Sequence, residues 1–177
     1  GDVYETIQSA VDIAPSSQTT IRLLADTSEK VTIGSGQDII LNLNSETLLY
    51  PGSGENVIIN KGNLTLENGT VSSTGGKGMI NNNAGATLTT RNVSLAVTTT
   101  TPKQVIYNNG GTAYISEGTN IETMSSSAGA IDNHGGTMVI ENAMIVSTGT
   151  RQGVYNDNNG SLEIRGANTY ISAKPDV

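Results

Sequence analysis

The chain has 177 residues, enough for a single domain with a sizeable core, yet it holds no Phe, Trp or Cys and only six Tyr, which excludes a wide aromatic core. Nine Lys and Arg against sixteen Asp and Glu give a net charge of −7; nucleic-acid binding, which needs clustered cations, is thereby excluded, and contact with an anionic membrane surface is disfavoured. No apolar run reaches the roughly 18 residues of a spanning helix, so we expect one domain over residues 1–177 without membrane insertion.

An amphipathic helix is predicted over residues 5–14. Its apolar side chains recur three and four residues apart and share one face: Ile7, Ala10, Val11 and Ala14. Thr6 or Asp2 can cap its start, and Pro15 ends it. We expect this helix to cover the open end of the strands that come after it, because an uncovered stack of strands exposes its core and its unpaired edges.

Residues 19–56 are strand-like but irregular. The apolar stretches Ile21–Leu24, Val31–Ile33 and Ile39–Leu43 alternate with polar residues, without a regular spacing between them. We expect them to form the first, irregular coils of a repeat architecture.

Residues 57–177 carry a repeat that begins with an aliphatic residue, any residue, and then Asn. It occurs at Ile58-Ile59-Asn60, Ile80-Asn81-Asn82, Ile106-Tyr107-Asn108, Ile131-Asp132-Asn133 and Val154-Tyr155-Asn156. The Asn positions therefore step by 22, 26, 25 and 23 residues. Each unit continues with an alternating strand, at Leu64/Leu66, Ala86/Leu88, Ala113/Ile115, Met138/Ile140 and Leu162/Ile164, and then a third apolar stretch near Val71, Val93 with Leu95, Ile121, Ile145 and Ile171.

Three short strands in 22–26 residues are typical of one turn of a three-sided solenoid. A leucine-rich repeat needs a different consensus, and propeller blades run to about 40–50 residues. The sequence therefore predicts an all-β fold, a right-handed single-stranded parallel β-helix of about six to seven coils. The repeated Asn would stack as a hydrogen-bonded ladder at a corner, and the Gly after it would supply a positive φ. Residues 172–177 show no capping pattern, so we expect a further segment, a loop or a partner to cover that end.

Two stretches of the chain resemble known bacterial β-helix proteins. Residues 6–12 (TIQSAVD) with 20–26 (TIRLLAD) are similar to the opening of pectate-lyase-like domains. Residues 39–44 (IILNLN), with the later coil 131–140 (IDNHGGTMVI), resemble surface proteins of Gram-positive gut bacteria. The resemblance implies a pectate-lyase-like solenoid in a secreted or wall-attached adhesive or glycan-facing module.

Many parallel β-helices cleave acidic polysaccharides, which requires grouped carboxylates. With the coils aligned on the Asn column, the position before Asn reads Ile59, Asn81, Tyr107, Asp132, Tyr155, and the position after it reads Lys61, Asn83, Asn109, His134, Asp157. A further column after the second strand reads Glu67, Thr89, Ser116, Glu141, Arg165. Acidic residues never occupy consecutive coils of one column. Asp132 and Asp157, with His134 between them, are the best catalytic candidate, and Glu141 with Arg165 is expected to form an exposed ion pair.

Tyr107 and Tyr155 share one outward column two coils apart, so roughly 9–10 Å separates them. Tyrosine rings stack on sugar faces, and Asn109, Asp132 and His134 could add hydrogen bonds. These five residues form the candidate binding set; the alternative is that the tyrosines are ordinary surface residues, as Tyr114 and Tyr170 are expected to be.

We expect a non-catalytic, monomeric module, secreted or held at a bacterial cell surface, whose partner is a polysaccharide or a host or cell-surface protein. No cofactor and no metal is expected, because a lone His lacks partners at ligand spacing. Two alternatives stay open: a polysaccharide lyase or glycoside hydrolase with its site near Asp132, His134 and Asp157, and a structural spacer.

Overall fold

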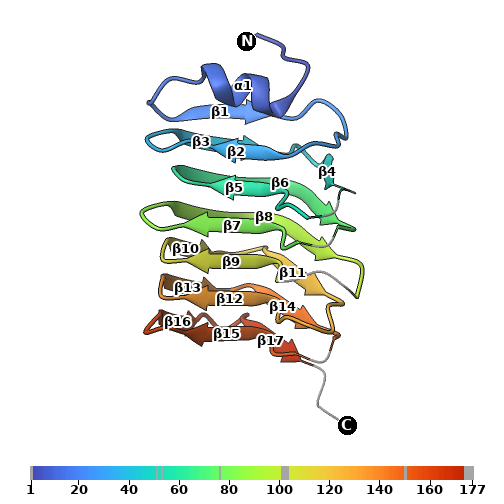
Figure 1. Cartoon of the computed structure of the whole chain (residues 1–177), viewed down its shortest axis with the longest axis vertical. Helices are drawn as coiled ribbons and strands as arrows, with labels where there is room; N and C mark the ends of the chain where they lie inside the picture. Colours follow the sequence, from blue (N-terminus) through green and yellow to red (C-terminus); the bar gives the residue numbers. More distant parts are fainter. Residues whose placement is uncertain are drawn as a thin grey trace.

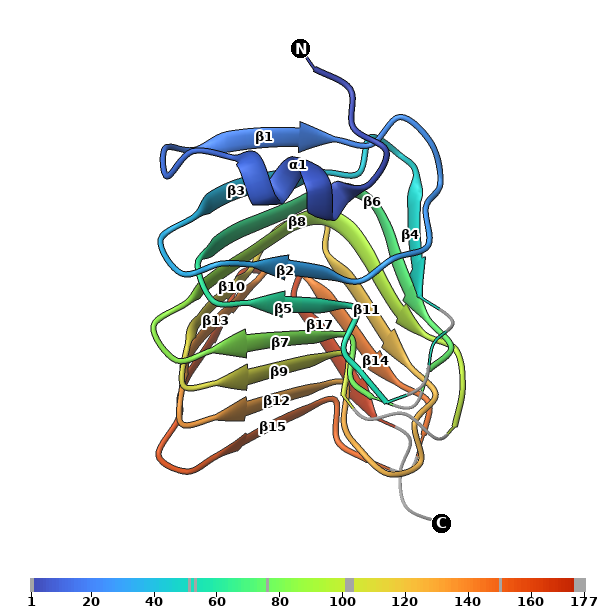
Figure 2. The ribbon, with the colours of Figure 1, turned by 45° about the horizontal axis from the view of Figure 1, so that its top comes forward.

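The computed structural model describes residues 2–50, 52, 54–75, 77–100, 104–149 and 151–173; the expected uncapped tail beyond residue 173 lies outside them. Across this part of the chain the backbone forms a parallel β-solenoid of about six turns, with one short helix at its N-terminal end (Figure 1). As the chain descends, the front strands run to the left and the rear strands to the right, so the coil is right-handed (Figure 2). The all-β, parallel β-helix prediction is confirmed.

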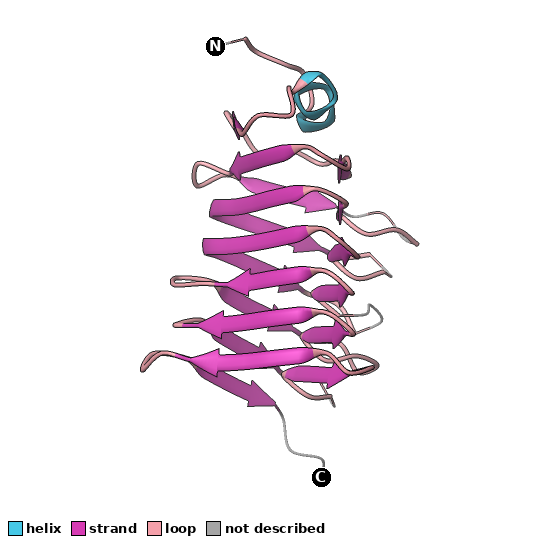
Figure 3. Ribbon diagram, turned by 90° about the vertical axis from the view of Figure 1, so that its left-hand side faces the viewer, coloured by secondary structure: helices cyan, strands magenta, loops and turns pink. Residues whose placement is uncertain are grey.

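Three walls make up each turn. The first wall is a six-stranded sheet in the described residues, made of β2 (Val31–Ile33), β5 (Ile58–Asn60), β7 (Ile80–Asn83), β9 (Ile106–Asn109), β12 (Ile131–His134) and β15 (Val154–Asp157). The second wall contains β1 (Thr19–Arg22), β3 (Asp38–Asn42), β6 (Asn63–Ser73), β8 (Thr87–Val97), β10 (Thr112–Ile115), β13 (Thr137–Glu141) and β16 (Ser161–Arg165). The third contains β4 (Thr47–Tyr50), the second halves of β6 and β8, β11 (Asn120–Thr123), β14 (Met144–Ser147) and β17 (Tyr170–Ala173). Figure 3 shows the strands lying across the long axis of the stack.

A narrow aliphatic core fills the space between the walls. Because alternate residues of a strand face opposite sides, each wall supplies inward columns of Ile, Leu and Val that stack from coil to coil. The first wall contributes Val31, Ile58, Ile80, Ile106 and Ile131, all buried and all in register. The second contributes Ile39, Leu64, Leu88, Ala113 and Met138, and the third Leu48, Val71, Leu95, Ile121 and Ile145.

The asparagine ladder lies at the corner between the first and second walls. Each amide nitrogen donates to the amide oxygen of the next coil, from Asn60 to Asn82 (2.8 Å), Asn82 to Asn108 (2.7 Å), Asn108 to Asn133 (2.7 Å) and Asn133 to Asn156 (2.6 Å). The positive φ expected after the Asn occurs at Gly85, Gly110 and Gly135, but not at Gly62, which follows Asn60. In the last coil described, Asn158 and Asn159 take that conformation instead. The ladder predicted from the sequence is confirmed.

A second corner was not anticipated. Between the second and third walls, residues with positive φ recur through the coils, at Asn44 with Ser45, and then at Asn68, Asn92, Gly118, Asn142 and Gly166. Asn92 donates to Asn68 across coils (2.8 Å). At Asn68 and Asn92 the bend is so tight that β6 and β8 each continue around it as one strand of 11 residues. The prediction of three separate strands in each coil is therefore wrong for these two coils.

One coil was also misaligned. The register pairs Leu64 with Leu88 rather than with Ala86, and Glu67 with Arg91 rather than with Thr89. The reason is the first corner, which is longer after Asn82 than after Asn60, so that the second strand begins later. Counting residues from the ladder Asn therefore predicts the register correctly before the first corner, but not for the strand that follows it.

The helix α1 (Ile7–Ile13) covers the N-terminal end, as expected, but is shorter than residues 5–14. Thr6 is the N-cap, with an extended backbone and a reciprocal capping box with Ser9, so Asp2 is not needed. The Gln8 side chain accepts from the backbone nitrogen of Thr32 (2.7 Å) and donates to its carbonyl (3.2 Å), acting as a substitute strand on the open edge of β2.

At the other end of the described stack, residues that face the core are less covered. Ile164 is 50% exposed, and Val154, Leu162 and Ile171 are partly exposed. None of the helices in the described ranges is long or apolar enough to cross a bilayer.

Candidate functional site

The candidate residues gather on the outer face of the first wall, over β9, β12 and β15. In β12, Ile131 and Asn133 are buried, so alternation directs Asp132 and His134 outward. The register places Asp132 directly between Tyr107 and Tyr155, and His134 directly between Asn109 and Asp157. Both columns continue in β7, with Asn81 beside Tyr107 and Asn83 beside Asn109.

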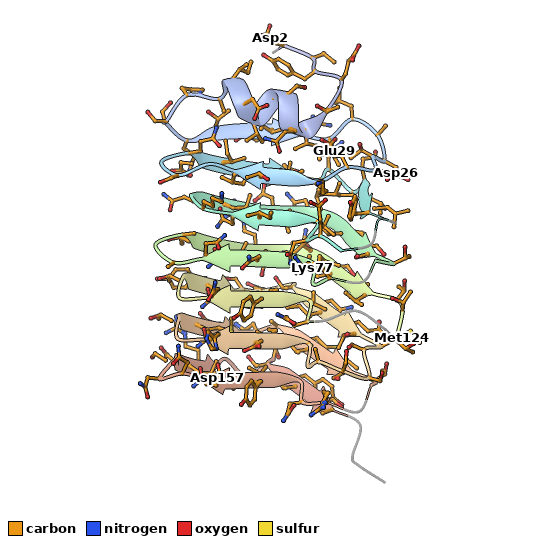
Figure 4. All side chains as sticks on the ribbon, viewed as in Figure 1. Asp2, Asp26, Glu29, Lys77, Met124 and Asp157 are labelled. Atoms are coloured by element: carbon orange, nitrogen blue, oxygen red, sulfur yellow. The ribbon has the colours of Figure 1, made fainter. Side chains whose placement is uncertain are left out.

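All five residues of the candidate binding set therefore lie on three adjacent strands, and we call this surface the platform. Figure 4 shows Asp157 on the front of the stack, near its C-terminal end. Tyr155 is 45% exposed, and Tyr107 is partly buried. By the strand spacing, the two rings are rooted about 9–10 Å apart along the solenoid axis. Tyr114 and Tyr170 are exposed on the second and third walls and take no part in the platform.

His134 connects the two columns. Its Nδ1 lies 2.9 Å from Oδ1 of Asp157, and its ring centroid lies 5.9 Å from that of Tyr107 with an interplanar angle of 35°. Its Nε2 lies 3.5 Å from Nδ2 of the exposed Asn158. The imidazole is thus held between a carboxylate and an aromatic ring, and it holds the Asp157 side chain in place.

Asp132 is in a different situation. Its Oδ1 is shielded from solvent and has no hydrogen-bond partner among the described residues. Burial raises the pKa of its carboxyl above the ordinary value, the nearby negative charge of Asp157 raises it further, and His134 lowers it. The pKa of the Tyr107 hydroxyl is raised by burial and then by Asp132 and Asp157. This is a partly desolvated surface of negative character.

The two carboxylates of the catalytic candidate come from adjacent strands of the first wall. Asp132 and Asp157 are offset by two positions along these strands, and the hydrogen-bonding contact of His134 is with Asp157.

Surface grooves are formed elsewhere on the described part of the chain. One, of about 550 Å³, lies along the second corner and is lined by Asn42, Asn44, Ser45, Asn68, Gly69, Thr70 and Asn92. The other, of about 130 Å³, lies at the N-terminal end of the first wall and is lined by Lys30, Val31, Thr32, Glu55, Asn56, Ile59 and Lys77.

No group of three or more potential metal ligands of the His, Cys, Asp or Glu type comes together in the part of the chain that the structure describes. Acidic residues of the second wall are instead paired with arginines. Arg165 contacts Glu141 at 3.0 Å, as expected from the sequence. Glu67, which is nearly buried, accepts from Arg91 at 2.6 Å and from Asn42 at 2.9 Å. The sequence did not reveal the Glu67–Arg91 pair, because the two residues fall in different columns when the coils are aligned on the Asn.

The chain was compared with known protein families, curated proteins and solved structures. No protein-family model, no curated protein and no solved structure matches the chain. What is shown is the architecture itself, a parallel β-solenoid of about six turns with an internal asparagine ladder.

Proposed function

We propose that this chain is a non-catalytic glycan-binding module of a bacterial surface or secreted protein, acting in adhesion. One observation carries the proposal. Tyr107 and Tyr155 lie in one outward column on either side of Asp132, with His134 and Asn109 in the next column. Tyrosine presents an apolar ring face to a sugar while its hydroxyl stays hydrated, and two such rings along one line suit an extended saccharide.

The scaffold supports this role. Beneath the platform, β9 and β12 are held by backbone ladders on both sides and by the buried Asn108 and Asn133, and β15 is held on one side by β12, so the outer side chains start from an ordered base. Preorganised side chains lose less freedom on binding. The location outside the cell is supported by the resemblance of residues 6–12 and 39–44 to bacterial surface β-helices.

A second candidate function is a polysaccharide lyase or glycoside hydrolase. It is favoured by the 2.9 Å contact of His134 with Asp157 and by the raised pKa of the neighbouring Asp132 carboxyl. The third alternative, a spacer, assigns no role to the platform.

A glycan array, combined with a degradation assay on polygalacturonate and related polymers, separates the three. We expect Tyr107→Ala and Tyr155→Ala each to weaken binding at least about tenfold, the scale of one lost aromatic contact. Tyr114→Ala is the matched control, because Tyr114 is similarly exposed, at 42%, but lies on the second wall.

Polymer cleavage that disappears in Asp132→Ala would establish the enzyme instead. If the chain neither binds a glycan nor cleaves a polymer, the spacer function is favoured.

A further inference from the structure

Two acceptor oxygens on the outer face of the first wall, one on the platform and one beside it, lack donors. Asn81 lies on β7 and Asp132 on β12, so these residues flank Tyr107 on its two sides within one outward column. In each, Oδ1 is shielded from solvent and has no hydrogen-bond partner among the described residues. A buried polar atom without a partner is uncommon in folded proteins and is a point at which a ligand can supply the missing donor.

The surroundings of Asp132 favour a cation. The groups packed around it are Tyr107 from β9, His134 from its own strand, and Tyr155 and Asp157 from β15. The charges that act on its carboxyl come from Asp157 and His134, and His134 is itself in contact with Asp157. An acidic group between two tyrosines is the combination that attracts ammonium groups, through charge and through the ring faces.

We propose that the platform recognises a glycan bearing free amino groups, with one ammonium seated against Asp132 between Tyr107 and Tyr155. This inference rests on the proposed glycan-binding function and names the class of glycan. The ammonium supplies the donor that Asp132 lacks, and Asn81, on the far side of Tyr107, is placed to accept from a neighbouring sugar of the same chain. Seating the charge there also relieves the repulsion between Asp132 and Asp157.

The rest of the same face explains why an extended glycan fits better than a single lysine side chain. The tyrosines, Asn81 and Asn109 follow the solenoid axis over consecutive coils, so they offer contacts to a chain of sugars rather than to one point. The lysines among the described residues lie toward the N-terminal end: Lys61 precedes His134 by three coils in its column, and Lys77 lies well above Asp157 in Figure 4. A polyanion is therefore repelled from the tyrosine end of this face.

The test compares chitosan oligomers, which carry free amines, with fully N-acetylated oligomers of the same length, by calorimetry on the intact chain. We expect the amine form to bind roughly tenfold tighter. In Asp132→Asn this preference should disappear while binding of the acetylated oligomer is kept. Glu122→Gln, which removes an exposed carboxylate from the third wall, is the matched control and should retain the preference.

The outcomes separate the two proposals. Equal affinity for both oligomers, lost in Tyr155→Ala, would overturn the amine inference and leave glycan binding intact. No affinity for either oligomer, nor for any glycan of the array, would overturn both. Binding of polylysine that outcompetes the amine oligomer would assign the acidic platform to a basic protein partner and overturn the glycan assignment.

Discussion

Replacing Asn108 by Ala tests whether the asparagine ladder stabilises the solenoid. Asn108 is fully buried and has ladder neighbours on both sides. Its Nδ2 also donates to the carbonyls of Gly111 (3.0 Å) and Thr137 (3.2 Å). Truncation leaves Oδ1 of Asn133 without its ladder donor, whereas Nδ2 of Asn82 keeps its bond to a backbone carbonyl.

The expected cost is set by these contacts. One buried acceptor left unpaired costs about 1–3 kcal/mol, and the weakened carbonyl contacts together with the small cavity bring the total to about 3–4 kcal/mol. Asn156→Ala is the matched control, because Asn156 belongs to the same column but is exposed, and Asn133 keeps two other acceptors there. We expect it to cost less than about 1 kcal/mol.

Urea unfolding, monitored by circular dichroism, measures both variants, with the free energy of unfolding taken from the midpoint and slope. An Asn108→Ala midpoint equal to that of the unmodified chain would refute a stabilising role for the ladder. Equal losses of stability in Asn108→Ala and Asn156→Ala would refute it as well, because the ladder would then contribute no more inside the stack than at its exposed member.

Three further predictions concern the cap, the second wall and the platform. Gln8→Ala, which removes both contacts to Thr32, should lower the free energy of unfolding by about 1–2 kcal/mol and speed hydrogen exchange in β2; unchanged exchange would contradict the capping role. Arg91→Ala should cost about 1–2 kcal/mol in urea unfolding because it leaves the nearly buried Glu67 with a single donor, and a neutral result would show the pair to be inert. For Asp132 the folded pKa is raised above the unfolded value, so the folded chain holds the proton more tightly and loses stability as pH rises through the folded pKa. Asp132→Asn should therefore match the unmodified chain below the unfolded pKa and be more stable above the folded one; thermal melts across this range that show the opposite trend would exclude burial as the cause.

The fold was predictable because its signals are local and repeated. The alternation of Ile58 with Asn60, and its recurrence at Ile80 and Asn82, fixes which side chains face the core in each coil. The position of Tyr107 beside Asp132 was predictable for the same reason, since both residues immediately precede the ladder Asn.

Other features depend on contacts that no local pattern encodes. Asn68 and Asn92 occur singly within long alternating strands, so the repeat pattern does not mark them as corner residues with positive φ, and only the Asn68-Gly69 pair is a local turn signal. The Glu67–Arg91 pair depends on the length of a corner that varies from coil to coil. The unpartnered oxygen of Asp132 is set by how side chains from three strands pack together, which becomes visible only in three dimensions.

The asparagine column has a consequence for how such a chain can change. In each coil the ladder Asn points inward, while the residues before and after it point outward and differ freely, as Asn81, Tyr107, Asp132 and Tyr155 do. The contacts that hold the fold are thus assigned to alternate positions of the same short strand, and the proposed recognition uses the positions between them. Substitutions at the outward positions would change the surface chemistry without touching the contacts that hold the stack, and duplication of a whole coil would lengthen this outer face by one row.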